Sequence, residues 1–422
     1  MSRIVFCFAS LAILAAVSAS NSFAEEWSQF RGPEGQAISR NKGLPTSWSA
    51  DKNIAWKTAL PGPGGASPIV VGDRIFITCY SGYAVPGAPG GDIGALQRHV
   101  LCIQRADGKV VWQKDVPAQQ PETPKVRDHG YASSTPVSDG KNIYVFFGKS
   151  GVIAFDLQGK QLWQADVGSK VHGWGSATSP VLYKDMVIVN AAVESESLIA
   201  LNKATGKEVW RMGGMKESWN TPILVPLAGG KTELVVAIMG KVLGVNPETG
   251  EQLWSCATDI GWYMVPSIVN DKDVVYSIGG RGTGGSLAVR AGGRGDVTAT
   301  HRLWRSNKGS NVPSPIVHEG HVYWVHETKG TVSCVKAEKG EVIFEESLAP
   351  NSQFYASPVL ADGKLYFLTR RGETYVIAAK PKYELLATNS LVDRSTFDAS
   401  PAVDGDRLLI RSDKFLYCIG GK

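Results

Sequence analysis

The sequence predicts an all-β protein, a single eight-bladed β-propeller whose four-stranded antiparallel blades are closed by an N-terminal strand that completes the last blade. The main observation is a repeat: a Ser-Pro or Thr-Pro dipeptide followed by an apolar strand recurs every 42 to 49 residues after a first interval of 68 residues. A tight turn containing Gly or Asp follows each copy, and most copies then reach a tryptophan. The composition agrees, because 47 glycines and 22 prolines among 422 residues favour turns and short strands over long helices.

The strand-leading dipeptides mark the start of each blade. They are Ser67-Pro68, Thr135-Pro136, Ser179-Pro180, Thr221-Pro222, Ser314-Pro315, Ser357-Pro358 and Ser400-Pro401, with Val265-Pro266-Ser267 as a degenerate eighth copy. A Gly- and Pro-rich insertion at about residues 82–97 accounts for the long first interval. The spacing is typical of a four-stranded propeller blade, so eight copies predict eight blades.

A tryptophan is expected to end the fourth strand of most blades. These residues are Trp112, Trp163, Trp210, Trp254 and Trp304, replaced by Phe344 in the sixth copy and by a leucine near Leu386 in the seventh. The eighth copy stops near Cys418 without such a strand, and residues 53–57, which contain Trp56, are expected to supply it. That pairing would close the ring and remove its open edges. The regular spacing indicates that the six tryptophans fill the gaps between neighbouring blades.

The beginning of the chain is typical of a secretory signal. Arg3 precedes an apolar run at residues 4–17, and Ser22 and Ala24 place small residues at a cleavage site. The run is shorter than the roughly 18 to 20 residues that span a bilayer. We therefore expect a signal peptide at residues 1–24 cleaved after Ala24, an N-terminal extension at 25–52 and the propeller at 53–422. The mature protein is expected to be periplasmic or secreted, without a transmembrane segment.

Charge and cysteine content narrow the expected partners. The net charge is +5 and no basic cluster stands out, so we expect no nucleic acid partner, and we expect a monomer.

Cys102, Cys334 and Cys418 share a blade position that is Ala or Gly in other copies, which favours buried free thiols. Cys79 precedes Cys102 by one strand, so a single disulfide between these two remains an open alternative.

The order of signals within a blade resembles a known repeat. Ser-Pro, two strands, Ala-Leu-Asn, Thr-Gly-Lys and Trp, as in residues 179–210, resemble the pyrroloquinoline-quinone (PQQ) propeller repeat of quinoprotein alcohol dehydrogenases and BamB-type assembly proteins. The segment from Trp27 to Pro33 is similar to the N-terminal signature of secreted bacterial PQQ-like repeat proteins. The resemblance implies the propeller fold. Its dehydrogenases hold the quinone against adjacent cysteines and bind calcium near a catalytic Asp, and its BamB-type proteins are lipid-anchored. This chain has no adjacent cysteines and no lipid-attachment cysteine.

The segments before each Ser-Pro are the best candidates for a functional rim, because they lead into the innermost strands and approach the axial channel. The candidate ligand or partner residues are His129, Tyr131, His172, Trp174, Trp219, Asn220, Trp262, Tyr263, Asn311, Tyr355, Phe397 and Asp398, with Arg281 from a Gly-rich hairpin at 279–285. Such a rim suits a planar ligand or an inserted peptide, although aromatic rings that only cap the channel explain it equally well. Two histidines beside Asp128 lack a further ligand, so no metal site is predicted.

Three functions are compatible with these features. The first is a non-catalytic binding or assembly platform in the bacterial envelope, without a cofactor, whose partners are envelope proteins or a small ligand at the channel mouth. The alternative is an oxidoreductase that uses PQQ and calcium to oxidise alcohols or sugars. The third is a carbohydrate-binding propeller in which Trp174, Trp219 and Trp262 stack on pyranose rings. No motif in the sequence assigns catalytic residues.

Overall fold

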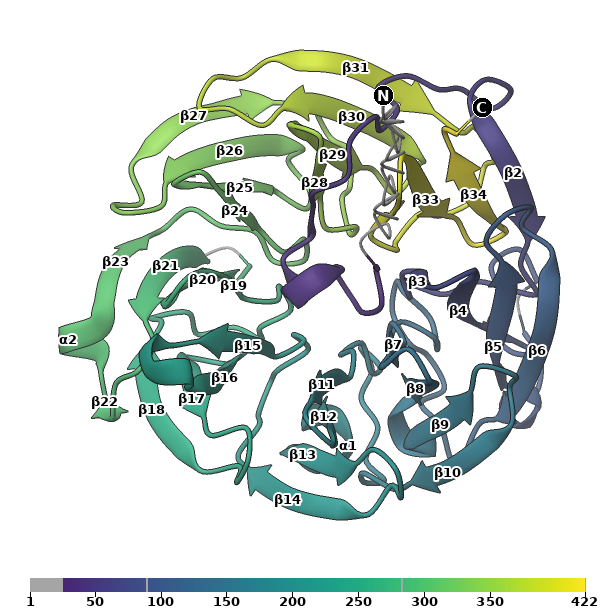
Figure 1. The fold of residues 1–422 in the computed structure, drawn as a ribbon, viewed down its shortest axis with the longest axis horizontal. Coiled ribbons are helices and arrows are strands. Elements are labelled where there is room, and N and C mark those ends of the chain that lie inside the picture. The colour runs from purple at the N-terminus through teal and green to yellow at the C-terminus, as the bar shows by residue number, and fades with distance from the viewer. Residues whose placement is uncertain (1–25, 89, 282–283, 422) are drawn as a thin grey trace, which may run out of the picture.

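Eight four-stranded antiparallel sheets surround a central axis in the computed structural model of the protein (Figure 1), and two of them carry one further short strand. The structure describes residues 26–88, 90–281 and 284–421. The predicted eight-bladed propeller is confirmed. The expected signal peptide and its cleavage after Ala24 lie outside the described residues. Within the described part of the chain, no helix has the length and apolar character needed to cross a membrane.

The first four blades follow one another along the chain. From the axis outwards their strands are β3 (Ile69–Val71), β4 (Arg74–Ser81), β5 (Gln97–Gln104) and β6 (Val110–Pro117); β7 (Val137–Ser138), β8 (Asn142–Phe146), β9 (Val152–Asp156) and β10 (Gln161–Ala165); β11 (Val181–Tyr183), β12 (Met186–Ala191), β13 (Ser197–Asn202) and β14 (Glu208–Gly213); and β15 (Ile223–Pro226), β16 (Thr232–Ile238), β17 (Lys241–Val245) and β18 (Gln252–Ala257). The short β22 (Gly295–Asp296) extends the fourth blade by parallel pairing with β18.

The remaining blades complete the ring. Their strands are β19 (Val269–Asp271), β20 (Val274–Gly279), β21 (Gly285–Arg290) and β23 (Arg302–Ser306); β24 (Ile316–His318), β25 (His321–Val325), β26 (Thr331–Lys336) and β27 (Val342–Ser347); β28 (Val359–Ala361), β29 (Lys364–Leu368), β30 (Glu373–Ala378) and β31 (Leu385–Ser390); and β32 (Ala402–Asp404), β33 (Arg407–Arg411), β34 (Phe415–Ile419) and β2 (Ile54–Ala59). The helices are η1 (Pro33–Gly35), η2 (Ile93–Ala95), η3 (Gly148–Ser150), α1 (Ala192–Ser195), η4 (Ala228–Gly230) and α2 (Thr298–His301).

The eighth blade joins the early strand β2 to the three strands β32, β33 and β34. β2 pairs antiparallel with β34, with Lys57 opposite Tyr417 and Ala59 opposite Phe415. The closing N-terminal strand predicted from the sequence is therefore confirmed. Every blade then has a neighbour on both sides, which leaves the ring without a terminal blade.

The blade tryptophans lie opposite small residues of the third strand and contact the next blade. Trp112 pairs with Cys102, and its Nε1 donates to the carbonyl oxygen of Leu157 in the second blade at 3.0 Å. The indoles of Trp56, Trp163, Trp210 and Trp304 donate in the same way to backbone carbonyls of the following blade. A Cβ atom at Gly244 would lie 2.0 Å from the ring of Trp254. Gly244 therefore has no room for a side chain, whereas Ala or Cys lies under the indole in other blades.

Two sequence expectations about these strands are wrong. β6 begins at Val110, so Trp112 lies near the start of the fourth strand and not at its end. In the seventh blade the position of the tryptophan is held by Ala387, which pairs with Val376 of the third strand, and not by a leucine. Leu386 is 39% exposed because the strand there turns it away from the blade interface.

The cysteines of the described chain are all free, so the disulfide left open between Cys79 and Cys102 does not form. In the register of β4 and β5, Cys79 lies opposite His99, whereas Cys102 lies opposite Phe76. Facing strands must bring two cysteines to the same register position before a bridge can close. Burial raises the pKa of the Cys102 thiol to about 12, which keeps it protonated.

The N-terminal extension covers one mouth of the axial channel. In Figure 1 it is the purple segment that crosses the centre of the ring. It begins on the first two blades, where Trp27 bridges Val70 and the amide of Ser138 donates to the carbonyl oxygen of Ser28 at 2.9 Å. It ends on the seventh blade, where β1 (Ile38–Ser39) pairs parallel with β28. These contacts lie at the far ends of the inner strands, so the extension closes the mouth opposite the segments that precede each Ser-Pro.

The close approach of Gly108 to Trp56 gives a testable prediction about ring closure. Gly108 has a φ of +75°, and a Cβ there would lie 2.5 Å from the indole of Trp56 on the closing strand. We expect Gly108→Ala to lower the free energy of unfolding by about 1 kcal/mol for the left-handed backbone and by about 1–2 kcal/mol more for the displaced ring. Urea unfolding followed by tryptophan fluorescence measures both.

Gly140 provides the matched control for this experiment. It has a φ of +83°, but no atom lies within 4 Å of the position that a Cβ would take. Gly140→Ala should therefore show the backbone effect alone. Equal losses in the two variants would contradict a role for the contact between Gly108 and Trp56 in closing the ring.

Candidate functional site

The channel mouth opposite the extension opens into a cavity of about 280 Å³. The segments that lead into the inner strands line most of it, and the β25–β26 turn and the β20–β21 hairpin provide the rest. Because the ring places these connections side by side, residues far apart in the sequence meet around one axis. The cavity volume is close to the lower limit for small-molecule pockets, about 300 Å³.

Four aromatic rings form much of the cavity wall: Trp174, Trp219, Tyr263 and Tyr355. The ring centroids of Trp174 and Tyr263 are 5.8 Å apart, and those of Trp219 and Tyr263 are 5.7 Å apart. The Trp219 indole is buried and donates to the carbonyl oxygen of Gly175 at 2.7 Å. Rings at these distances hold each other in place through edge and tilted contacts. The four rings therefore give the cavity an apolar side.

An arginine and two carboxylates stiffen one side of the mouth. The guanidinium of Arg370 lies 4.1 Å from the centroid of the Tyr355 ring. It donates to both carboxylate oxygens of Asp398, at 2.6 and 3.0 Å, and lies 3.8 Å from Asp128. Burial raises the pKa of Asp398 to about 6 in spite of the ion pair with Arg370. Arg370 thus fixes the edge of the aromatic wall.

Two other polar residues of the cavity lining, His129 and Glu327, are held by neighbours. His129 Nδ1 lies 2.6 Å from Ser133 Oγ, and burial lowers the pKa of this imidazole, which favours its neutral form at pH 7. The Glu327 carboxylate accepts hydrogen bonds from the Ser310 hydroxyl and from the backbone N–H of Asn311, each at 3.0 Å. These neighbours set the positions of the hydrogen-bonding atoms that His129 and Glu327 present.

The cavity brings together seven of the thirteen rim residues named from the sequence. These are His129, Trp174, Trp219, Tyr263, Arg281, Asn311 and Tyr355. The Gly-rich hairpin at 279–285 joins β20 to β21 as expected, and it carries Arg281 to the cavity.

The other six rim residues lie elsewhere. Phe397 is fully buried in the core, and the amide of Asn220 is buried in hydrogen bonds to Ser218 and backbone groups. Trp262 is 39% exposed and packs on Tyr263 outside the cavity lining. Asp398 lies behind the wall in its ion pair. Tyr131 and His172 line a smaller cleft between the first three blades. Trp174, Trp219 and Trp262 therefore do not form one flat platform.

Some lining residues were missed in the sequence. Glu327 and Thr328 come from the turn between the second and third strands of the sixth blade, and Asp128 and Gln353 come from the segments before the inner strands. Among these four residues the sequence points only to Asp128, as a neighbour of the rim histidines. No sequence pattern identifies Glu327 as a lining residue. Whether a residue of this turn reaches the cavity depends on how the neighbouring blades are placed.

The lining residues do not fit a quinone with calcium. PQQ carries three carboxylates, whereas the cavity presents Asp128 and Glu327 together with the single arginine Arg281. Without a bound cation, the two protein carboxylates would repel those of the ligand. Calcium prefers six to eight oxygen ligands, and among the residues that the structure describes no three or more His, Cys, Asp or Glu side chains are grouped to hold a metal.

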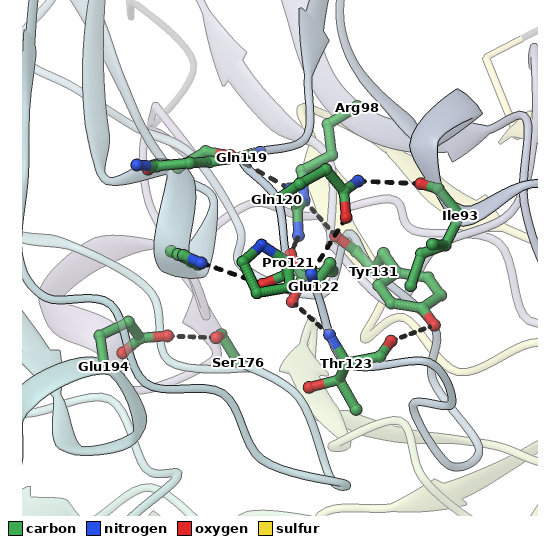
Figure 2. A network of polar contacts seen from close by, with 12 residues as sticks. Ile93, Arg98, Gln119, Gln120, Pro121, Glu122, Thr123, Tyr131, Ser176 and Glu194 are labelled. Carbon is green, nitrogen blue, oxygen red and sulfur yellow. Dashed lines mark hydrogen bonds and ion pairs between the residues drawn. The ribbon is translucent and has the colours of Figure 1, made fainter.

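A second polar network lies behind the cavity, between the first three blades (Figure 2). Buried Arg98 on β5 donates from Nε to the carbonyl oxygen of Tyr131 at 2.9 Å, from Nη1 to Ser150 Oγ at 3.2 Å and from Nη2 to the Glu122 carboxylate at 2.6 Å. Close by, the Ser176 hydroxyl donates to Glu194. Burial raises the pKa of Glu194 to about 7. The network ties the loop at residues 118–131 to the ring and so positions His129.

Comparison with known proteins identifies related chains. A family model described as outer membrane protein assembly factor BamB matches residues 96–346 and 293–412. The chain is 29% identical over 196 residues to the quinoprotein alcohol dehydrogenase PedH of Pseudomonas putida, which covers 43% of this chain and 30% of that protein. It is 25% identical over 209 residues to the outer membrane protein assembly factor BamB of Burkholderia pseudomallei, which covers 48% of this chain and 45% of that protein. The matches thus span less than half of either relative.

Solved structures share the architecture. BamB from Moraxella catarrhalis superposes with a TM-score of 0.62 at 14% identity, over 87% of this chain and 96% of that one. Quinohemoprotein alcohol dehydrogenase from Comamonas testosteroni superposes with a TM-score of 0.64 at 12% identity, over 96% of this chain and 82% of that one. At these identities the likeness concerns the fold alone. Because the family model covers well over half of its residues, the chain belongs to the PQQ-like propeller family described as outer membrane protein assembly factor BamB.

Proposed function

We propose that the protein is a non-catalytic binding platform of the bacterial envelope, which holds a protruding loop of a partner protein in the open mouth of its channel. The observation that carries this proposal is the difference between the two mouths. The N-terminal extension crosses one of them, whereas the other opens into a cavity of about 280 Å³ with four aromatic rings in its wall. A rigid ring with one open mouth suits the capture of a protruding segment.

The chemistry of the mouth favours an apolar or aromatic anchor on the partner. Trp174 and Tyr263 offer ring faces and edges, and buried aromatic anchors supply much of the affinity at protein interfaces. Arg281, Asp128 and Gln353 are exposed at the rim, where they can orient polar groups on either side of the anchor. A relative named as an outer membrane protein assembly factor supports an envelope partner. A role in the envelope rests on the same relative and on the signal peptide expected at residues 1–24.

Site-specific photo-crosslinking in the native bacterium tests the proposal. We expect p-benzoylphenylalanine in place of Gln353 at the mouth to give a defined adduct with an envelope protein, because this position borders the cavity. The same probe in place of Lys339, which is exposed on a peripheral turn, is the control and should not give that adduct. Trp174→Ala should weaken the adduct at least tenfold. The same adducts from both positions would contradict binding at the mouth.

The two other functions are distinguished by ligand titration of the purified protein. A ligand that binds only the native state raises the free energy of unfolding by RT ln(1 + [L]/Kd), so the melting temperature keeps rising with the ligand concentration. We expect no such rise with PQQ and calcium, no dye-linked oxidation of alcohols or aldoses, and no quenching of tryptophan fluorescence by oligosaccharides. Turnover that Trp174→Ala abolishes would replace the proposal with an oxidoreductase. Quenching that Trp174→Ala abolishes would replace it with carbohydrate binding.

A further inference from the structure

The cavity at the open mouth adjoins a second hollow, the outer cleft, which lies between the fifth and sixth blades. The outer cleft has a volume of about 340 Å³, and Arg281, Glu327 and Thr328 line it as well as the cavity. Residues 307–309, which follow β23, form its wall on the fifth blade, and the turn at 326–329 forms its wall on the sixth. A bound segment that is longer than one anchor residue can therefore reach both hollows.

The exposed charges of the outer cleft are mainly positive. Arg281, Lys308 and Lys329 are all exposed there. Lys308 pairs with Glu345, whereas Arg281 and Lys329 take part in none of the ion pairs among residues 26–88, 90–281 and 284–421. The remaining carboxylate of the lining, that of Glu327, is 6% exposed and already accepts the two hydrogen bonds described above. An anionic group that enters the outer cleft would therefore be attracted to both cations.

The turn that carries Lys329 is held by hydrogen bonds. The backbone N–H of Gly330 donates to the carbonyl oxygen of His326 at 3.2 Å, and the backbone N–H of His326 donates to that of Thr331 at 2.9 Å. His326 Nδ1 accepts from the backbone N–H groups of Thr328 and Lys329, at 3.3 and 3.4 Å. Burial lowers the pKa of this imidazole, which favours its neutral form at pH 7. The turn thus presents Lys329 from a fixed backbone, and His326 adds no charge to the cleft.

We propose that the partner segment carries a carboxylate side chain a few residues from its apolar anchor, and that Arg281 and Lys329 bind this carboxylate while the anchor occupies the cavity. Such a segment belongs to the same envelope partner, so this proposal rests on the proposed function. Because Arg281 lines both hollows, the carboxylate and the anchor must lie close together in the segment. Opposite charges at the edge of an interface raise the rate of association and fix the register of the bound segment. A segment with lysine or arginine at this place would be repelled.

Photo-crosslinking from the outer cleft tests the proposal in the native bacterium. We expect p-benzoylphenylalanine in place of Asn307, which lines the outer cleft, to give an adduct with the same envelope protein as the probe in place of Gln353. Mass spectrometry should place both crosslinks in one segment that contains Asp or Glu close to an apolar residue. A defined adduct from Gln353 alone, or a segment without Asp or Glu, would overturn the proposal and leave the proposed function intact. No defined adduct from either position would contradict both.

Two charge reversals, one beyond each end of β26, test the role of the cations. Lys329 precedes β26 and Lys339 follows it, so the two exposed lysines lie on opposite faces of the ring. We expect Lys329→Glu to lower the yield of the Gln353 adduct about tenfold, because it replaces an attraction by a repulsion. Lys339→Glu makes the same change of charge on the other face and should leave the yield unchanged. Equal yields in the two variants would overturn the proposal.

Arg281→Gln keeps the test decisive if Lys329→Glu does not fold, which thermal unfolding of the purified variant would show. It removes the cation that the fifth blade contributes to the carboxylate and should lower the yield of the Gln353 adduct about threefold. An unchanged yield in this variant would overturn the proposal.

Discussion

Arg98→Met is expected to lower the free energy of unfolding by about 3–5 kcal/mol, because it leaves the Glu122 carboxylate buried without its counter-ion. Both side chains of this pair are almost fully buried, with a distance of 2.6 Å between Nη2 and the carboxylate oxygen. The guanidinium also bonds to the carbonyl oxygen of Tyr131 and to Ser150, so the substitution removes the centre of the network in Figure 2. Urea unfolding at pH 7 measures the loss.

Replacing both partners separates the buried charge from the lost packing. In Arg98→Met/Glu122→Gln no unpaired carboxylate remains, so we expect the double variant to recover a large part of the loss seen in Arg98→Met. Arg98→Lys keeps a cation but cannot make the three separate contacts of the guanidinium, and it should fall between the two. A double variant less stable than Arg98→Met would show that the ion pair is not what makes the single substitution harmful.

Trp254→Ala is the second large effect, with an expected loss of about 3–5 kcal/mol. Trp254 is fully buried, whereas most blade tryptophans are partly exposed. Its Nε1 donates at 2.7 Å to the buried carboxylate of Glu233, which also accepts from the Gly292 amide and from Arg294. Truncation would leave a cavity beside a carboxylate that has lost a donor. Thermal and urea unfolding should both detect the loss.

Trp304→Ala is the matched control for Trp254. It occupies the same blade position, opposite Ala288, but it is partly exposed and donates to a backbone carbonyl, that of Ala337, at 2.8 Å. We expect a clearly smaller loss, since less area is buried and no charged group loses a donor. Equal losses for the two variants would mean that Glu233 adds nothing to the effect at Trp254.

The fold could be predicted from the sequence because each blade repeats the same strand order and the same packing residues. The small residue under each indole, such as Cys102 or Gly244, and the Pro-led inner strand recur at the spacing of one blade. In the seventh blade the sequence predicts the wrong residue at the tryptophan position. Ala387 is too small to stand out as a packing residue, whereas Leu385 and Leu386 beside it are apolar like core residues although they are exposed. Whether Cys79 and Cys102 can form a disulfide depends on the register of β4 and β5, which the composition of the chain does not determine.

The candidate site was predicted only in part, for a geometric reason. The position of Tyr263 or Tyr355 before an inner strand places it near the axis, and this follows from the repeat. Whether a side chain then points to the cavity or into the core depends on backbone turns that differ between blades, as Phe397 demonstrates. The contribution of the extension was not predictable, because nothing in residues 25–52 indicates which inner strands they contact.

The pairing of β2 with β34 also determines when the protein can finish folding. In the sequence β2 comes before the first blade, whereas its partner β34 follows the seventh. The eighth blade can therefore form only after the other seven have been synthesised, and the unpaired edge of β2 is exposed in the meantime. Closing the ring thus depends on a contact between strands that are far apart in the sequence, which is slow to form.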